Sequence, residues 1–309
     1  MDYFDLHCDT ISRLAETGGA LDKAPCHVNL QKAAGFGRYA QVFALFVPDQ
    51  KTPAQALGVY RTLRDTFFAQ TRAFPGSVMQ CRTAADLDEA FRTGRRAAIL
   101  SVENGAALGG DIAVLDEFMR DGVRLLTLTW FGENELGFGS MEGGRLKPFG
   151  RQVLAALPAH GIVPDISHLS DEGVAEVFDS YEGPVVATHS NARRAAGHCR
   201  NLTARQIAEI ARRGGLIGLN LCRAFLCDNE KEAGCEDVYR HIRTFLDLGA
   251  RDALCFGSDF DGASVPADIA DLSGVANVWE YCAKRGMDEA VLRGIFFENA
   301  AGFWRRIFP

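Results

Sequence analysis

The chain lacks a surplus of positive charge, because 33 lysines and arginines stand against 40 aspartates and glutamates and give a net charge of −7. Nucleic acids and anionic membranes bind basic surfaces, so this balance argues against both as partners. The chain also lacks an apolar run longer than a strand, and its first residues, MDYFDLHCD, carry charge where a secretory leader needs apolar residues. We therefore expect a cytoplasmic protein that acts on a small molecule, with no nucleic acid and no membrane as partner.

Cysteine is present, but not in the pattern of a disulfide framework. The nine cysteines are odd in number and scattered from Cys8 to Cys282, which favours reduced thiols. Cys222, Cys227 and Cys235 lie close together in the sequence, but their spacing does not match the CxxC pattern of zinc sites. We expect these three to be buried or loop thiols.

Signatures of other enzyme classes are missing as well. No GxSxG elbow occurs, and no glycine-rich loop is followed by the lysine of a phosphate-binding loop. These absences argue against a serine hydrolase and a nucleotide-binding enzyme. No repeat, low-complexity tract or proline- and serine-rich linker divides the 309 residues. We expect a single domain over residues 1–309.

What the sequence does contain is an alternation of short apolar segments with amphipathic stretches, the pattern of repeated βα units. Eight strands are predicted, beginning at Tyr3, Tyr39, Ala97, Val123, Ile162, Pro184, Leu216 and Ala253. Their continuous apolar character favours a parallel sheet covered by helices on its outer face. The predicted fold class is therefore α/β, as a (β/α)8 TIM barrel with extra C-terminal helices.

Helices are predicted between these strands, beginning at Pro53, Asp111, Leu202 and Glu236. Thr203 followed by Gln206 predicts a capping box at the start of one of them. The segment near residues 78–81 and two closing helices around Trp279 and Phe297 are extra to the eight units. The glycines of LGFGSMEGG, from Leu136, predict a long mobile loop after the fourth strand, a candidate active-site lid.

Histidines and carboxylates fall at the ends of the predicted strands, where the active sites of (β/α)8 enzymes lie. The candidate residues are His7, Asp9, Glu103, His168, His189 and Asp259. A spacing of two residues on a strand places His7 and Asp9 on the same side, with Cys8 facing the helices. Imidazoles and carboxylates together suit zinc and its first-row neighbours. Six such residues exceed one tetrahedral site, which favours two ions with a bridging hydroxide as the nucleophile.

Each of these residues also has a purely structural interpretation. A single histidine at the end of a strand is usually structural, and an HxD pair alone is a weak motif. The metal site is favoured because all of these strand ends are in register. The remaining histidines, His27, His160, His198 and His241, occupy loop or helix positions, where we expect surface or capping roles.

The ordered motifs DLHCDT, SVENG, DISHLS, ATHSNAR and GSDFDG resemble the membrane dipeptidase (renal dipeptidase) family of the amidohydrolase superfamily. The resemblance runs from about Asp5 to Asp261 and returns in the closing ENAAGFWRR segment. It implies two Zn²⁺ ions, or other divalent first-row metals, with Glu103 bridging them and Asp259 as the general acid and base. The first ion would be held by His7, Asp9 and Glu103, and the second by Glu103, His168 and His189.

The resemblance also implies a substrate-binding arginine, Arg200 in HCRNLT, which would clamp a carboxylate through its bidentate guanidinium. Without the motif, Arg200 would be interpreted as a surface arginine. The sequence departs from the family at TLTW, where Trp130 replaces a histidine thought to contact the scissile carbonyl. Stabilisation of the oxyanion would then come from the metals or from a nearby polar group such as Asn134, or be weaker. Asn220 begins NLC, which departs from an aromatic-rich family pattern, and is a further candidate substrate contact.

The predicted function is a zinc-dependent dipeptidase that hydrolyses small dipeptides, including L-Xaa-D-Xaa, through a metal-bridging hydroxide. Family members are often homodimers, which sets the expectation for assembly. Trp130 keeps open a second hypothesis, a binuclear amidohydrolase acting on another small amide, lactam or ester. A third is a metal-binding sensor or scaffold without catalysis, which the complete ligand set disfavours.

Overall fold

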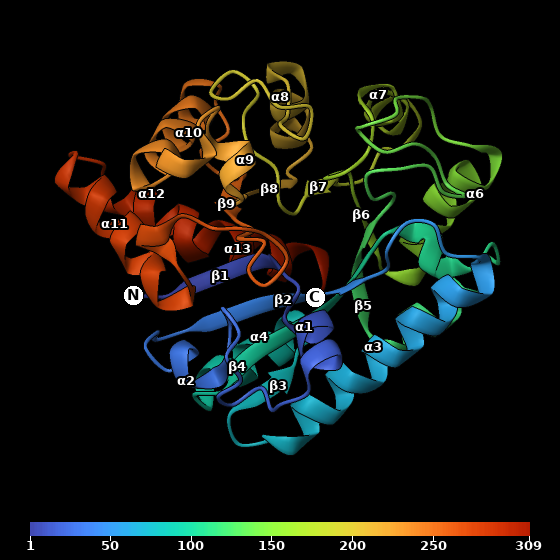
Figure 1. Cartoon of the computed structure of the whole chain (residues 1–309), viewed down its shortest axis with the longest axis horizontal. Coiled ribbons are helices and arrows are strands. Elements are labelled where there is room, and N and C mark those ends of the chain that lie inside the picture. The colour runs from blue at the N-terminus through green and yellow to red at the C-terminus, as the bar shows by residue number, and fades with distance from the viewer.

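Eight parallel strands close into a barrel in the computed structural model, which describes residues 1–309 (Figure 1). Around the barrel the strands are β1 (Tyr3–Cys8), β2 (Tyr39–Phe46), β4 (Arg96–Glu103), β5 (Val123–Thr127), β6 (Val163–Asp165), β7 (Val186–Ala187), β8 (Leu216–Leu219) and β9 (Leu254–Phe256). Pairing of β2 with β4 and of β9 with β1 completes the ring. The short β3 (Val78–Gln80) pairs with the first half of β4, and β5 pairs with the second half. The predicted barrel and the extra segment near residues 78–81 are both confirmed.

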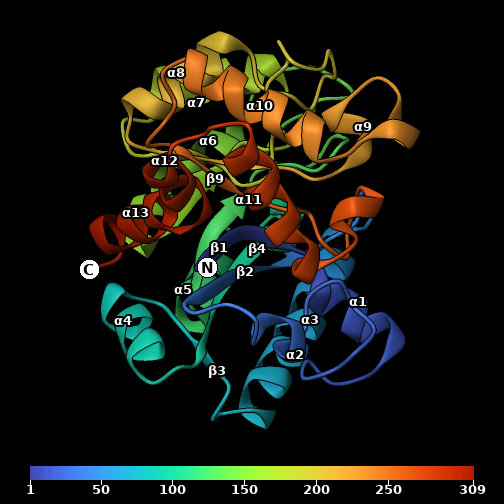
Figure 2. The ribbon, with the colours of Figure 1, turned by 90° about the vertical axis from the view of Figure 1, so that its left-hand side faces the viewer.

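Helices surround the barrel and follow most of its strands (Figures 1 and 2). They are α1 (Thr10–Thr17), α2 (Leu30–Ala33), α3 (Pro53–Ala73), α4 (Ala84–Arg92), α5 (Val114–Asp121), α6 (Pro148–Ala156), α7 (Asp171–Ser180), α8 (Ala204–Arg212), α9 (Arg223–Leu226), α10 (Cys235–Asp247), α11 (Val275–Lys284), α12 (Glu289–Arg293) and α13 (Asn299–Ile307). The predicted capping box starts α8. The Thr203 hydroxyl accepts a hydrogen bond from the backbone N–H of Gln206, and the Gln206 side chain accepts one from the backbone N–H of Thr203. None of the helices combines the length and apolar character needed to cross a membrane.

The apolar core divides into an outer layer between strands and helices and a smaller inner cluster inside the barrel. Inner residues such as Phe4, Leu6 and Ile99 belong to the strands, mostly near their starts. Trp304 of helix α13 and Phe308 just after it belong to this cluster, and the ring centroids of Trp304 and Phe4 lie 6.2 Å apart. The C-terminal helix therefore closes the barrel at the end where the strands begin, and Figure 2 shows it near α4. The opposite end is left for the polar residues.

Strand β1 contains an irregularity that matters for the site. Asp5 pairs with Gln41, but the next pairing joins Cys8 to Phe43, so β1 carries one residue more than β2. Regular alternation from Asp5 would send His7 away from the barrel axis, and the extra residue resets it. Bulges of this kind commonly redirect a side chain beside an active site.

The cysteines and His241, which we expect to have no chemical role, differ in how well they match the sequence prediction. All nine cysteines are free thiols, in line with the sequence prediction. Of the two roles expected for His241, surface or capping, the surface role is wrong, because its side chain is fully buried. Nδ1 of His241 accepts the backbone N–H of Ala192, and Nε2 lies 3.0 Å from the carbonyl oxygen of Leu226. His241 therefore links α10 to the loop after β7 and to the C-terminal end of α9.

Candidate active site

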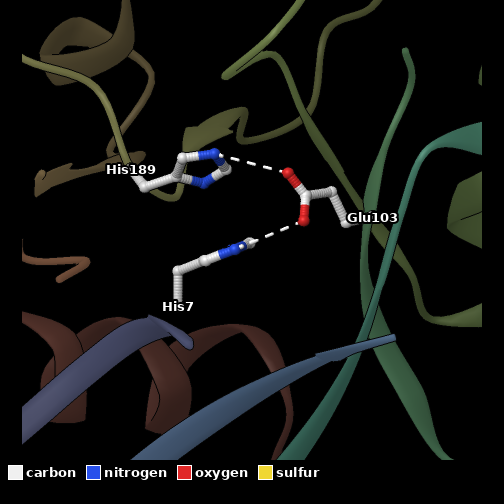
Figure 3. Close-up of side chains that lie close together, drawn as sticks. All are labelled: His7, Glu103 and His189. Carbon is white, nitrogen blue, oxygen red and sulfur yellow. Dashed lines mark ion pairs between the residues drawn. The ribbon is translucent and has the colours of Figure 1, made fainter. Parts of the chain in front are cut away.

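All six candidate metal and proton-transfer residues meet at the C-terminal end of the barrel, with Glu103 at their centre. One oxygen of Glu103 lies 3.4 Å from Nε2 of His7. The other lies 3.0 Å from Nε2 of His168 and 3.6 Å from Nε2 of His189. Figure 3 shows the carboxylate between His7 and His189, with one oxygen directed to each. Nε2 of His7 is also 3.3 Å from a carboxylate oxygen of Asp9.

The arrangement fits metal ions better than it fits a closed hydrogen-bond network. Ligand atoms of His7, Glu103 and His189 lie within 4.8 Å of one another, and so do those of His7, Asp9 and Asp259. Nε2 of His7 and Oδ1 of Asp9 are buried and have no hydrogen-bond partner. Buried polar atoms without partners are costly, and a cation would satisfy both. Imidazole and carboxylate donors of this kind are those that zinc and related metals prefer.

The charges in the cluster oppose one another across short distances. Burial, followed by repulsion from Glu103, raises the pKa of Asp9 to about 7. Burial lowers the pKa of His168 to about 4 and that of His189 well below its usual value. Burial also disfavours the ionised form of Glu103, but the imidazoles of His7 and His168 hold its pKa well below its usual range. His168 and His189 are therefore neutral beside an ionised Glu103, as metal binding requires. Burial opposes the charge of His7 too, but the carboxylates of Glu103 and Asp9 outweigh it and raise the pKa of His7 well above its usual value, so His7 must release a proton when a metal binds.

Behind the cluster, a buried hydroxyl and a buried carboxylate orient His189. Thr188 Oγ1 donates to Asp165 at 2.6 Å, so it accepts from Nδ1–H of His189 at 2.8 Å. This leaves the lone pair of Nε2 directed at the site. Asp165 also accepts from the hydroxyls of Thr127 and Ser167. Thr188 and Asp165 were not among the residues predicted from the sequence, although they lie inside the motifs ATHSNAR and DISHLS.

Asp259 follows β9 in a left-handed backbone conformation, with φ of 63°. Its backbone N–H donates to the carbonyl of His7, and its Oδ2 accepts from the side chain of Asn220 at 2.9 Å. The next turn brings Gly262 against the site: a Cβ there would lie 2.1 Å from Asp9 Oδ2 and 2.7 Å from Asp259 Oδ1. Gly262 was also not predicted from the sequence to be a site residue, although it is the last residue of the motif GSDFDG. Only glycine allows the backbone to approach these two carboxylates so closely.

A pocket opens beside the cluster, with Asp9, Glu103, His168 and Asp259 among its lining residues. Its aromatic wall is formed by Phe46, Trp130, Phe131 and Phe225. The Trp130 ring packs edge-on against Phe46 at 4.9 Å and lies 6.3 Å from the His168 ring. The structure therefore brings Trp130 to the pocket, close to a candidate metal ligand.

Arg200 is buried behind this pocket, with only 2% of its surface exposed, so its interpretation as a surface arginine is wrong. Its guanidinium lies over the rings of Phe131 and Phe225, which both line the pocket. It donates to Ser190 Oγ at 3.4 Å and to the carbonyl of His189 at 3.3 Å, and its Nε has no partner. No carboxylate of the chain forms an ion pair with it. Burial lowers the pKa of Arg200, and a cation held in this way favours an anion beside it.

The structure does not bring Asn134 to the pocket. Its Nδ2 donates to Asn104 Oδ1 and to the carbonyl of Leu128, both at 2.8 Å. Its Oδ1 accepts the backbone N–H groups of Leu136 and Gly137. The amide is therefore used entirely in fastening the glycine-rich loop to the end of the barrel. Movement of that loop over a substrate stays a prediction.

Fold and site together define the class of this protein, a metal-dependent hydrolase with a (β/α)8 barrel. The model of the membrane dipeptidase family (peptidase family M19) matches residues 1–307. The chain belongs to this family, as the motifs led us to expect.

Two solved structures agree with this assignment, and a curated relative is similar over most of the chain. A metallo peptidase from Rhodobacter sphaeroides, liganded with a phosphinate mimic of the dipeptide L-Ala-D-Ala, is 29% identical, with a TM-score of 0.93 over 99% of both chains. The dipeptidase AC, a metallo peptidase of family M19, is 30% identical, with a TM-score of 0.93 over 100% of this chain and 99% of its own. An uncharacterised protein in the pqqA 5′ region of Klebsiella pneumoniae is 27% identical over an alignment of 243 residues that covers 75% of this chain and 88% of the relative.

Proposed function

We propose that this protein is a cytoplasmic, zinc-dependent dipeptidase that hydrolyses small dipeptides with a free C-terminal carboxylate, including L-Xaa-D-Xaa. The observation that carries this proposal is Arg200, a buried guanidinium with no carboxylate partner, placed beside a cluster of metal-type ligands. The Rhodobacter sphaeroides relative, which is similar over almost its whole length, is liganded with a mimic of L-Ala-D-Ala. A dipeptide offers both the amide for the cluster and the carboxylate for the arginine.

Two zinc ions would be held by five residues of the cluster, with Glu103 shared between them. His7 and Asp9 would complete the first site, and His168 and His189 the second. Bound zinc lowers the pKa of water and polarises a carbonyl, which is the chemistry that amide hydrolysis needs at neutral pH. The unpartnered Nε2 of His7 and Oδ1 of Asp9 support this assignment.

The chain's own residues supply binding and proton transfer. Asp259 would take a proton at its carboxylate when water attacks and deliver it to the departing amine nitrogen, so that the C–N bond breaks with a neutral leaving group. A substrate carboxylate that enters between Phe131 and Phe225 would pair with Arg200 and fix the amide beside the cluster. The aromatic wall would keep bulk water away and strengthen both contacts.

Trp130 favours a second candidate function, hydrolysis of another small amide, lactam or ester. The resemblance implies that a histidine at this position would offer a ring nitrogen to the scissile carbonyl, whereas an indole has one N–H donor and a larger ring. Trp130 lines the pocket, so its size reshapes the space for the substrate. This change concerns the choice of substrate and leaves the metal ligands untouched.

The test is hydrolysis by zinc-reconstituted protein across L,L and L,D dipeptides, with N-acylated and C-terminally amidated dipeptides as controls and a chelator blank. Chelator-sensitive cleavage that requires the free carboxylate is the expected result. Cleavage that tolerates amidation would contradict the role of Arg200. No cleavage of any dipeptide by fully metallated protein would favour the second candidate function.

A further inference from the structure

Asn220, expected from the sequence to contact the substrate, is directed at Asp259 and does not line the pocket. Its side chain is fully buried just beyond β8. Oδ1 of Asn220 accepts the backbone N–H of Cys222 at 2.6 Å. A backbone N–H can only donate, so the amide NH2 group must face the other way. There, Nδ2 lies 2.9 Å from Asp259 Oδ2 and 3.3 Å from the carbonyl oxygen of His189.

The backbone of Asn220 is held as firmly as its side chain. Its N–H donates to Oδ1 of Asn191 at 2.9 Å, and Nδ2 of Asn191 donates back to its carbonyl oxygen at 2.9 Å. Asn191 is itself fully buried in the loop after β7. This reciprocal pair fixes the position from which Asn220 reaches Asp259.

Asp259 depends on this contact, because the Asn220 amide makes the sole hydrogen bond to its carboxylate within the chain. The backbone of Asp259 is left-handed, a conformation that residues other than glycine rarely adopt unless contacts with the rest of the chain hold them in it. With Oδ2 held by Asn220, the free oxygen is Oδ1, which lies on the side of Gly262. Gly262 lines the substrate pocket.

We propose that Asn220 is a positioning residue that holds Oδ2 of Asp259 so that Oδ1 carries the proton to the leaving amine. The inference rests on the proposed function, in which Asp259 protonates that nitrogen as the C–N bond breaks and returns to its ionised form. Asn220 acts through Asp259 and touches neither substrate nor metal. Loss of its N–H donor should slow proton delivery while leaving substrate binding and zinc binding unchanged.

The experiment compares two leaving groups in zinc-reconstituted Asn220→Leu and Asn220→Ser proteins. One substrate is a dipeptide, and the other is its thioester analogue, in which sulfur replaces the scissile nitrogen and leaves as a thiolate without a proton. For the dipeptide, kcat should fall about 10- to 100-fold with unchanged KM. For the thioester, the loss should stay below about 3-fold, since protonation of the leaving group is not required. Asp259→Asn removes the base as well as the acid, so it should slow both substrates but the dipeptide more than the thioester. Asn277→Leu, at an exposed position on α11, should give no loss.

Other outcomes would overturn the inference in distinguishable ways. Equal losses on both substrates in the Asn220 variants, with the leaving-group dependence kept in Asp259→Asn, would refute the role of Asn220 alone. Loss of zinc from both Asn220 variants, measured by metal analysis, would give Asn220 a structural role instead. No leaving-group dependence in Asp259→Asn would refute the acid role of Asp259, and the inference with it.

Discussion

Gly262 offers a direct test of the site, because its missing side chain leaves room for two carboxylates. Its φ is not in the left-handed region, so alanine can adopt the same backbone. The added Cβ would lie 2.1 Å from Oδ2 and 2.8 Å from Cγ of Asp9, and 2.7 Å from Oδ1 of Asp259. Ordinary van der Waals contact begins near 3.4 Å, so Asp9 must move by more than about an ångström in Gly262→Ala.

The displacement should affect function much more than stability. Asp9 is a short side chain that can rotate away, so the free energy of unfolding of zinc-free Gly262→Ala should fall by about 1 to 3 kcal/mol, as for other overpacked sites. A misplacement of about 1 Å at reacting groups costs about 100-fold in rate. We expect kcat to fall by at least that factor and the first zinc to bind about 10- to 100-fold more weakly.

Zinc content after dialysis, zinc affinity against a competing chelator, and dipeptide kinetics would measure these effects. Gly302→Ala is the matched control, because nothing lies within 4 Å of its added Cβ and the residue is inside α13. Replacing a helical glycine should stabilise the fold by about 0.5 to 1 kcal/mol without changing activity. If Gly262→Ala bound two equivalents of zinc with wild-type affinity and turned over normally, the assignment of Asp9 and Asp259 to the site would be refuted.

Three further predictions concern the carboxylate clamp, the residues behind the metal ligands and the buried histidine. Arg200→Lys keeps the charge but loses the bidentate geometry, so kcat/KM for dipeptides should fall about 10- to 100-fold; an equal loss on amidated dipeptides would contradict the clamp. Thr188→Val removes the acceptor for His189 and should weaken zinc binding about 10- to 100-fold in a chelator competition, whereas Thr188→Ser should not. Burial lowers the pKa of His241 from 6.5 to about 4. Between these pH values the unfolded chain binds more protons than the folded chain, so the free energy of unfolding decreases as the pH is lowered. From pH 7 to pH 5 this loss is about 2 kcal/mol, and urea unfolding of zinc-free His241→Gln should lack it.

The barrel could be predicted because its pattern is local. Each strand is a short apolar run, each helix an amphipathic one, and the order of the elements dictates a parallel sheet. The metal-type residues could be predicted for the same reason, since a parallel barrel brings all C-terminal strand ends to one rim. Neither step needs a distance between residues far apart in the sequence.

The parts that escaped prediction depend on such distances. Thr188 orients His189 only because Asp165, on the neighbouring strand, accepts a hydrogen bond from the Thr188 hydroxyl. The sequence predicts Asn220 as a substrate contact, but the backbone N–H of Cys222 binds its Oδ1 and so turns its NH2 group toward Asp259. Sequence spacing fixes the face of a strand on which a side chain lies. It does not fix the partner that the side chain meets across the barrel.

The closing of the barrel and the assembly of the site are the same structural event. Pairing of β2 with β4 ends at Phe46 and Glu103, and Glu103 then reaches His7 on β1 with one oxygen and His168 and His189 beyond β6 and β7 with the other. Strand β4 pairs with none of β1, β6 and β7, so these ligands reach Glu103 only in the folded barrel. Bringing buried carboxylates together costs free energy in the absence of metal, as the raised pKa of Asp9 indicates. Zinc that binds the folded chain in preference to the unfolded chain would offset this cost and stabilise the barrel at its C-terminal end.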